Sequence, residues 1–434
     1  MENFKKIVKR QTPARTIAVG FAALILSGTV LLLLPVAVQG ARLPGLDALF
    51  TATSAVCVTG LVTVDPGDTF TLFGQAVLAV LMQLGGLGIS SVSMGLAIAA
   101  GRRISFRGRS LVREALNVES FEGMVKLVRA IMTMTLLVEG IGAVASYPVF
   151  ARDYPPLRAA WISIFHAVAS FNNAGFDVLG GGHSLIPYCS NVWLNLVTDA
   201  MIVLGGIGFM VVLDVLRCRG RFRKLTLHSK VVLTTTAVLI LGGALLLWLT
   251  EPISFLAALF QSITTRTAGF STIDIGAMTN AGLLVMMILM FIGASPGSTG
   301  GGIKTTTFFV LMQEVRIIFS KRRLGAFKRR LPKESLDKAA TITLLGAVVV
   351  FVGTFVLCVL EPQLSFVQLL FEQVSAYSTA GLTMGITAGL HPASKAVLIA
   401  TMFIGRVGAF TLLSLWVTRP EPSAQYTEEA ITIG

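Results

Sequence analysis

Long apolar runs constrain this chain more than any other feature. There are eight of them, and most approach the ~20 residues that cross a hydrocarbon core of ~30 Å. Charged residues make up only 13% of the sequence, against roughly 25% in a typical soluble domain. The sequence therefore predicts an all-α, polytopic membrane protein with eight transmembrane spans, at residues 17–38, 71–100, 127–147, 192–216, 231–250, 281–293, 340–360 and 396–417.

The positions of the basic residues predict how the chain is oriented. The formal net charge is +13, which on its own would also suit a nucleic-acid-binding protein. The Lys and Arg residues, however, recur after alternate spans, as in the cytoplasmic loops of membrane proteins. We therefore expect a multi-pass protein of the cell membrane with no nucleic-acid partner. Its basic cytoplasmic segments would be residues 5–15, 102–129, 217–230 and 316–338.

Four short stretches resemble one another and lie between the paired spans. Each follows an apolar segment too brief to cross a membrane, contains small and hydroxyl side chains, and closes on a glycine. About ten residues of helix reach only halfway through the bilayer. Backbone that continues non-helically from that depth is stable only beside a water-filled cavity or inside protein. The stretches occupy residues 50–61, 165–176, 260–271 and 371–382.

Proline and acidic residues mark where the half-length helices should begin. Proline is tolerated in a first turn because its missing N–H has no helical partner there. Negative charge is favoured at the same place by the helix dipole. The residues that suggest these starts are Pro44, Pro156, Pro252, Pro362, Asp47, Glu251 and Glu361.

The spacing of the four stretches indicates an internal repeat. Their closing glycines are about 100 residues apart, and a second glycine landmark follows each, at 84–88, 204–208, 292–293 and 404–408. Each repeat holds two full spans, so all four have the same orientation. The sequence therefore predicts four parallel helix–pore loop–helix repeats around a pseudo-fourfold central pore. The predicted repeats are residues 1–113, 114–226, 227–330 and 331–434.

The closing parts of the four stretches predict a selectivity filter. No carboxylate lies in them, so the backbone carbonyls would replace the hydration shell of an ion, as in potassium filters. Glycine permits the dihedral angles that aim successive carbonyls at one axis. The residues predicted to bind the ion with their backbone are Val58, Thr59, Gly60, Asn173, Ala174, Gly175, Thr267, Ala268, Gly269, Thr379, Ala380 and Gly381.

A glycine-rich segment, GASPGSTGGGIK at residues 293–304, interrupts the return span of the third repeat. Glycine and proline disfavour a helix by ~1 and ~3 kcal/mol respectively. The phosphate-loop pattern fails because Ile303 separates Gly302 from Lys304. A flexible loop in mid-membrane beneath a filter is better interpreted as a movable gate. The predicted gate residues are Gly297, Ser298, Thr299, Gly300, Gly301, Gly302, Lys304 and Arg406.

Arg406 lies roughly 20 Å of helix from Arg419, which is too deep for its charge to reach the interface. It takes the place of the second glycine of the landmark. We expect it to face the pore and bond to the glycine-rich loop, with a buried ion pair to Glu139 as the alternative. Lys304 has the further interpretation of a helix-start cation. Arg266 is expected to brace the filter by hydrogen bonds.

The motifs TATSAVCVTGL, SFNNAGF, QSITTRTAGFST, SAYSTAGLTMG, GASPGSTGGGIKTTTF and IGRVGAFTL resemble those of the Trk/Ktr/HKT superfamily of potassium transporters. The resemblance covers essentially the whole chain and is strongest to the bacterial Ktr membrane subunits. In that family a filter glycine in all four repeats accompanies potassium preference, and a serine in the first repeat accompanies sodium permeation. Ala409 departs from the family, which often has proline there.

The resemblance also implies partners. It implies a homodimer, to which the tail at residues 426–434 contributes, and a cytoplasmic ring of nucleotide-binding regulatory subunits that acts on the gate. The basic stretches 217–230 and 321–338 would meet such a partner or anionic membrane lipid. No cofactor is expected in this chain. Potassium would be the transported ion, and sodium is a candidate activator.

Other functions fit the sequence less well. The four histidines are scattered, and the chain has neither a nucleophile elbow nor an H-E-x-x-H motif, so we do not expect an enzyme. No apolar span carries arginine at every third position, as a voltage sensor would. The alternative that remains is a sodium-coupled potassium symporter.

Overall fold

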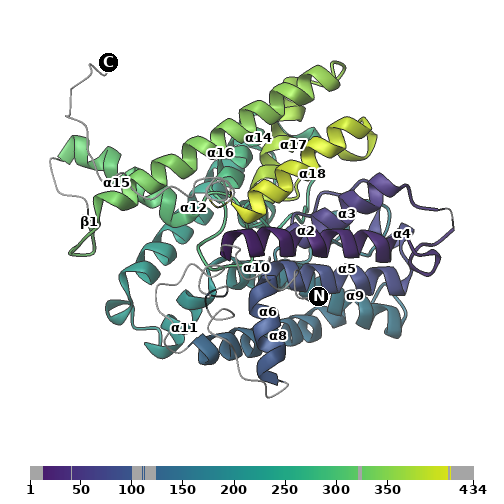
Figure 1. Cartoon of the computed structure of the whole chain (residues 1–434), viewed down its shortest axis with the longest axis horizontal. Coiled ribbons are helices and arrows are strands. Elements are labelled where there is room, and N and C mark those ends of the chain that lie inside the picture. Colours follow the sequence, from purple (N-terminus) through teal and green to yellow (C-terminus); the bar gives the residue numbers. More distant parts are fainter. Residues whose placement is uncertain are drawn as a thin grey trace, which may run out of the picture.

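A computed structural model describes residues 13–40, 42–99, 110, 112, 124–320, 325–408 and 411. These residues are almost entirely helical, and their one sheet is a hairpin of β1 (Gly325–Ala326) and β2 (Arg329–Arg330). The same order of elements occurs four times along the chain: a long helix, a half-length helix, an extended segment and a return helix (Figure 1).

The long helices are the elements with the length and composition to cross a membrane. They are α2 (Pro13–Leu32), α8 (Met124–Phe150), α12 (Leu227–Thr250) and α16 (Lys333–Leu360). Their side chains alternate between buried and strongly exposed apolar residues, because one face packs inward and the other meets lipid. Each packs lengthwise on the half-length helix that follows it.

The half-length helices occupy the interior of the molecule. They are α3 (Gly45–Cys57), α9 (Pro156–Phe171), α13 (Phe255–Thr264) and α17 (Phe366–Ser378). Phenylalanine stands at the same place in each, and all four rings are completely buried, at Phe50, Phe165, Phe260 and Phe371. Ser254 and Ser365 cap the last two helices by accepting a hydrogen bond from a first-turn amide.

The return helices are α5 (Leu72–Leu87), α10 (Val192–Gly206), α14 (Asn280–Phe291) and α18 (Pro392–Val407). The first three are followed by α6 (Ile89–Ala99), α11 (Phe209–Arg217) and α15 (Thr305–Ser320). Shorter elements connect the rest: α4 (Pro66–Thr69), η1 (Pro35–Ala37), η2 (Ile186–Tyr188), η3 (Phe222–Lys224), η4 (Ile275–Ala277) and η5 (Thr387–Gly389).

Two return segments that the sequence predicts as continuous spans are sharply bent, so that prediction is wrong. The axis turns by 100° between α5 and α6 and by 98° between α10 and α11. Gly88 and Gly208, with φ of 79° and 94°, make these turns in a region that favours glycine. Four described helices are long and apolar enough to cross a membrane, or six if each bent pair is one span.

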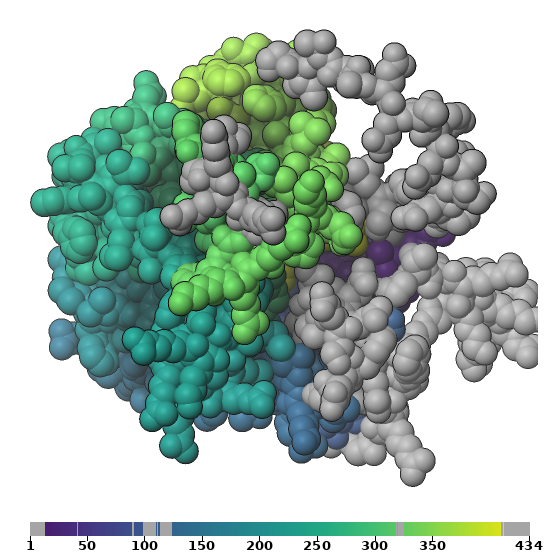
Figure 2. All heavy atoms as spheres, turned by 90° about the vertical axis from the view of Figure 1, so that its left-hand side faces the viewer, coloured from purple at the N-terminus to yellow at the C-terminus, as the bar shows by residue number. Residues whose placement is uncertain are grey.

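The four groups of elements are arranged in a circle. Each return helix contacts the half-length helix of the next group, in the pairs α5–α9, α10–α13, α14–α17 and α18–α3. The last pair closes the circle by joining the end of the chain to its beginning. Viewed from the side that carries the hairpin, the chain follows the rim of the molecule from blue at the bottom through teal at the left to green at the top (Figure 2).

Glu251 and Glu361 act at different helices from those the sequence suggests. Both end a long helix rather than start a half-length one, so Pro252 and Pro362 precede the capping serines. Their carboxylates accept hydrogen bonds where a return helix begins: Glu251 Oε1 from Thr279 Oγ1 at 2.5 Å, and Glu361 Oε1 from the His391 amide at 2.6 Å. Only Asp47 lies in the first turn of a half-length helix, as predicted.

The landmark glycines allow three of the return helices, α5, α10 and α18, to approach their own half-length helices. A Cβ added at Gly85 would lie 2.0 Å from the carbonyl oxygen of Val56. At Gly205 and Gly405 the corresponding distances, to the carbonyls of Phe171 and Tyr377, are both 1.9 Å. No side chain fits at such separations, so glycine is required at these places by packing.

Gly405→Ala should therefore destabilise the protein. The added methyl would overlap the Tyr377 carbonyl, and overpacking of this kind costs about 1–3 kcal/mol. We expect a lower midpoint of thermal unfolding in detergent. Gly242→Ala is the matched control, because a Cβ there meets nothing within 4 Å and alanine favours a helix. Equal midpoints for the two variants would contradict the packing argument.

Candidate functional site

The four extended segments share one unusual backbone conformation. Val58, Asn173, Thr267 and Thr379, each at the end of a half-length helix, have φ of 55°, 57°, 74° and 52°. Two residues later Gly60, Gly175, Gly269 and Gly381 have φ of 97°, 66°, 85° and 83°. Positive φ is strained for non-glycine residues and most of all for β-branched ones. Such strain persists only where the surroundings hold the backbone in place, and it concentrates at functional sites.

The residue between the two strained positions directs its peptide group in the same way in all four segments. The amide of this residue donates to a backbone carbonyl of its own half-length helix. The donor and acceptor pairs are Thr59 with Ser54 and Ala174 with Ala169, at 2.8 Å, and Ala268 with Thr264 and Ala380 with Ser375, at 2.9 Å. The carbonyl of the same residue accepts from no donor among the residues that the structure describes. Buried carbonyls are almost always paired, so these four, all in fully buried residues, are available to a ligand.

The four segments close into a ring, and their glycines make the closest contacts. A Cβ on Gly60 would lie 2.7 Å from the Ala174 carbonyl oxygen, and one on Gly175 would lie 2.7 Å from that of Ala268. A Cβ on Gly269 would lie 2.9 Å from the Ala380 oxygen, and one on Gly381 would lie 2.0 Å from that of Thr59. Each unpaired carbonyl therefore abuts the glycine of the preceding segment. We call these twelve residues, 58–60, 173–175, 267–269 and 379–381, the carbonyl ring.

The predicted gate residues lie in a loop between α14 and α15 that is held by the second group. The amides of Ser295 and Thr299 donate to the carbonyls of Gly206 and Gly205, at 3.0 and 3.2 Å. The Gly297 carbonyl accepts from the Phe209 amide at 2.9 Å, across the bend that follows α10. The loop is further closed by a parallel bridge between Ile292 and Ile303. The glycine-rich segment is thus well ordered by backbone hydrogen bonds.

This loop lies directly against the carbonyl ring. A Cβ added at Gly300 would lie 2.0 Å from Thr267 Oγ1, and one at Gly301 would lie 2.3 Å from Thr379 Oγ1. The two threonine hydroxyls are buried and have no hydrogen-bond partner among the described residues. Only glycine lets the loop approach the ring so closely.

Two cations bind the carbonyls of the loop. Lys304 Nζ donates to the carbonyls of Gly300 and Gly301, at 2.8 and 3.3 Å. The Arg406 guanidinium donates to the carbonyl of Thr299, and also to those of Gly85 and Gly86 in α5. Lys304 directly precedes α15 and is therefore a cation at a helix start. It also donates hydrogen bonds to the loop.

The alternative partner of Arg406 is excluded by these contacts. Glu139 accepts from Asn172 Nδ2 at 3.1 Å and from Gln83 Nε2 at 3.3 Å, and forms no ion pair among the described residues. Glu139 is thus part of a polar cluster with Gln83 and Asn172 between the first two groups. The sequence did not suggest this cluster, because Gln83 and Asn172 sit in apolar and small-residue contexts with no charge to attract notice.

The remaining predicted gate residues shape the loop from within. Gly297 and Gly302 have φ of 65° and 68°, which a residue with a side chain rarely adopts. Ser298 Oγ donates to the Ser295 carbonyl at 2.6 Å. These residues help to set the conformation of the loop itself.

Arg266 does not brace the ring as predicted. Its Nε is buried without a hydrogen-bond partner in the described chain. Its side chain instead lines a small cavity together with Ile202, Val203 and Gly206 of α10. Ala409 and the tail at residues 426–434 lie outside the described residues.

Three carboxylates lie near one another in the segments that follow Gly60 and Gly175. Asp65 Oδ2 accepts from the Gly182 amide at 2.7 Å, and Asp68 Oδ2 from the Gly181 amide at 2.9 Å. Asp177 Oδ1 accepts from the Leu179 amide at 3.1 Å. Burial, together with the nearby charge of Asp65 and Asp68, raises the pKa of Asp177 from its usual 3.8 to about 7. Nowhere in the described residues do three or more His, Cys, Asp or Glu side chains form a metal-binding group.

A membrane-spanning helical scaffold with a ring of unpaired carbonyls at its centre is the architecture of a cation-transport protein. The family profile described as TrkH, cation transport protein, matches residues 5–251 and 221–428. This chain belongs to that family of multi-pass membrane proteins.

Individual relatives agree with this assignment. The chain is 41% identical over 449 residues to the potassium/sodium uptake protein NtpJ of Enterococcus hirae, covering 99% of both chains. It is 36% identical to the Ktr system potassium uptake protein B of Bacillus subtilis, again over 99% of both. The crystal structure of the potassium transporter TrkH from Vibrio parahaemolyticus has the same fold, with a TM-score of 0.74 over 94% of this chain and 86% of that one, at 20% identity.

The raised pKa of Asp177 predicts how stability depends on pH. Between about pH 4 and pH 7 the unfolded chain has lost this proton while the folded chain keeps it, so stability should fall as pH rises through this interval. Asp177→Asn should flatten that fall and raise stability near pH 7.5. Thermal unfolding midpoints measured across this pH range test it. Asp274→Asn, which removes an exposed carboxylate, serves as the control, and a slope unchanged by Asp177→Asn would contradict the prediction.

Proposed function

We propose that this chain takes up potassium through the carbonyl ring, which acts as a selectivity filter. The observation that carries the proposal is the set of four buried carbonyls, one from each segment, that no described donor satisfies. Carbonyl oxygens without donors replace the hydration shell of a potassium ion. The twelve residues of the ring would bind the ion through their backbone, and their side chains would hold its shape.

The relatives support potassium as the transported ion. The protein from Bacillus subtilis is named for potassium uptake, and the one from Enterococcus hirae for potassium and sodium uptake. The second name keeps sodium coupling as the alternative function, and sodium as a candidate activator. Four ring glycines favour potassium, since the family resemblance associates a serine in the first repeat with sodium permeation.

The glycine-rich loop would be the gate of this pore. It contacts the ring at Thr267 and Thr379, and Arg406 and Lys304 place two positive charges beside it. Cations next to the ion path repel potassium electrostatically, and the effect is strong where water is excluded. Movement of the loop would clear the ion path. It would also displace the charged side chains of Arg406 and Lys304, which bind the loop.

We also propose the partners that the family resemblance implies. They are a second copy of this chain and a cytoplasmic ring of nucleotide-binding regulatory subunits acting on the gate. The relative from Bacillus subtilis is named as a component of a Ktr system, which supports a multi-component assembly. Exposed Lys328, Arg329 and Arg330 on the β1–β2 hairpin offer a basic surface to such a partner or to anionic lipid.

Arg406→Gln, or deletion within residues 297–302, should raise potassium flux. Either change removes the bond from Arg406 of α18 to the Thr299 carbonyl. If this bond couples α18 to the loop by about 1–3 kcal/mol, its loss shifts the equilibrium between the closed and the open pore by roughly 5- to 150-fold. Potassium uptake by reconstituted protein measures it. Arg152→Gln is the control, because it removes an exposed positive charge outside the loop, the carbonyl ring and the basic cytoplasmic segments. Uptake equal to the unaltered protein at all concentrations would refute the gate.

Gly60→Ser should reduce the preference for potassium over sodium by about tenfold. A side chain at φ of 97° and 2.7 Å from the Ala174 oxygen must distort the ring, at about 1–3 kcal/mol of backbone strain. The ratio of potassium to sodium permeability in liposomes is the measurement. The same recording separates the two functions, since a channel reverses at the potassium equilibrium potential and a coupled symporter does not. An unchanged ratio would contradict the filter.

A further inference from the structure

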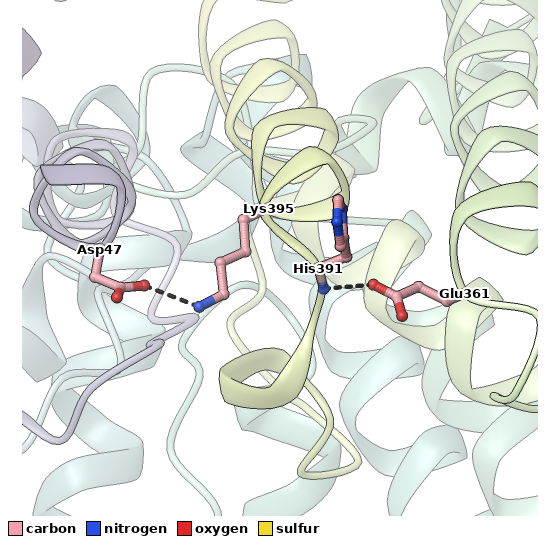
Figure 3. A network of polar contacts seen from close by, with 4 residues as sticks. All are labelled: Asp47, Glu361, His391 and Lys395. Atoms are coloured by element: carbon pink, nitrogen blue, oxygen red, sulfur yellow. Dashed lines mark hydrogen bonds and ion pairs between the residues drawn. The ribbon is translucent and has the colours of Figure 1, made fainter. Parts of the chain in front are cut away.

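Helix α18 carries Arg406 near its C-terminal end and is anchored at its N-terminal end by an ion pair. Lys395 Nζ lies 2.9 Å from Asp47 Oδ1, in the first turn of α3 (Figure 3). It is the one ion pair among the described residues, and the two side chains are only 12% and 14% exposed. The pair joins the fourth group to the first, where the circle of helices closes.

A second contact fixes the same end of α18 to its own group. The His391 amide donates to Glu361 Oε1 at 2.6 Å, and His391 Nδ1 caps the helix by accepting from the Ala393 amide at 3.2 Å (Figure 3). The start of α18 is therefore held from two sides, by α3 through Lys395 and by the end of α16 through Glu361. Both contacts involve a carboxylate.

The other end of α18 is held by different bonds. Arg406 donates to the Thr299 carbonyl of the loop and to two carbonyls of α5. Lys395 and Arg406 are about 16 Å apart along one uninterrupted helix at 1.5 Å per residue. Between them Gly405, the neighbour of Arg406, packs closely against the Tyr377 carbonyl. A displacement of the start of α18 therefore reaches Arg406 through a rigid element.

The other return helices lack this arrangement. In α5 the residue at the place of Lys395 is Gln75, whose Oε1 accepts from Trp161 Nε1 of α9 at 2.7 Å. That contact also joins one group to the next, but it is neutral, and α5 carries Gly86 where α18 carries Arg406. In α10 the corresponding Asn195 bonds only to carbonyls of its own group, and in α14 the residue is Leu283. The ion pair thus occurs on the return helix that binds the loop through an arginine side chain.

We propose that Asp47 and Lys395 are positioning residues for the gate, which hold α18 so that Arg406 reaches the Thr299 carbonyl. This inference rests on the proposed function, in which the loop is the gate. Loss of the ion pair frees the start of α18, weakens the bond from Arg406 to the loop, and opens the pore more often. The Asp47–Lys395 ion pair, which lies on the opposite side of the carbonyl ring from the loop, is thereby coupled to the gate.

The test compares Lys395→Met and Asp47→Asn, which break the pair from either side, with Lys395→Arg, which keeps the charge. Tyr188→Phe is the control, since it breaks a polar contact, from Tyr188 Oη to Asp153 Oδ2 at 2.8 Å, that involves no return helix. Hydrogen–deuterium exchange at residues 293–304 of the full-length protein in lipid nanodiscs is the first readout. Potassium flux in liposomes is the second. If Lys395→Met fails to yield folded protein, Asp47→Asn supplies the result.

We expect Lys395→Met and Asp47→Asn to raise loop exchange and basal flux by about two- to fivefold, the range for loss of a modest ion pair. Lys395→Arg should retain values near those of the unaltered protein, and Tyr188→Phe should leave loop exchange unchanged. In the Arg406→Gln background, Lys395→Met should add nothing further. This last result distinguishes the coupling from a general loss of stability, which would add to the effect of Arg406→Gln.

Three outcomes would overturn the inference. They are loop exchange unaffected by either variant, an equal effect of Tyr188→Phe, or additive effects of Lys395→Met and Arg406→Gln. The proposed function fails separately. If loop exchange rises while flux stays constant in every variant, the ion pair positions Arg406 but the loop does not control the pore.

Discussion

The close approach of four backbone segments at glycine is the contact on which the rest of this structure depends. Each ring glycine leaves room for a carbonyl oxygen of the adjacent segment, at distances that a Cβ could not share. The residue that carries this oxygen donates its own amide to a carbonyl of its half-length helix. The oxygen is consequently left without a donor in the interior of a membrane protein, where such a group is costly unless a ligand satisfies it. The helices around the ring hold this arrangement in place.

The four groups share this backbone but differ in what lies beneath it. The third provides the loop against Thr267 and Thr379, and the second holds that loop through Gly205 and Gly206. The fourth supplies Arg406, which reaches both the loop and α5 of the first. Selectivity would therefore depend on all four groups alike, whereas control would depend on contacts between particular groups.

Much of this could be predicted from the sequence because the relevant signals are local. The stretches that contain Gly60, Gly175, Gly269 and Gly381 repeat, and the depth of Arg406 follows from its distance to Arg419. What could not be predicted depends on contacts between distant residues. Glu251 and Glu361 satisfy amides about thirty residues further on, as a helix start can be capped by any nearby carboxylate. The bends at Gly88 and Gly208 are hidden because apolar residues continue across them.

Thallium, which substitutes for potassium and scatters anomalously, tests the central claim most directly. Crystals of the protein prepared in a thallium salt should show anomalous density on the axis of the carbonyl ring, coordinated by the carbonyls of Thr59, Ala174, Ala268 and Ala380. The density should fall when potassium competes and persist in excess sodium. Density absent from the ring, or displaced equally by sodium, would contradict the account.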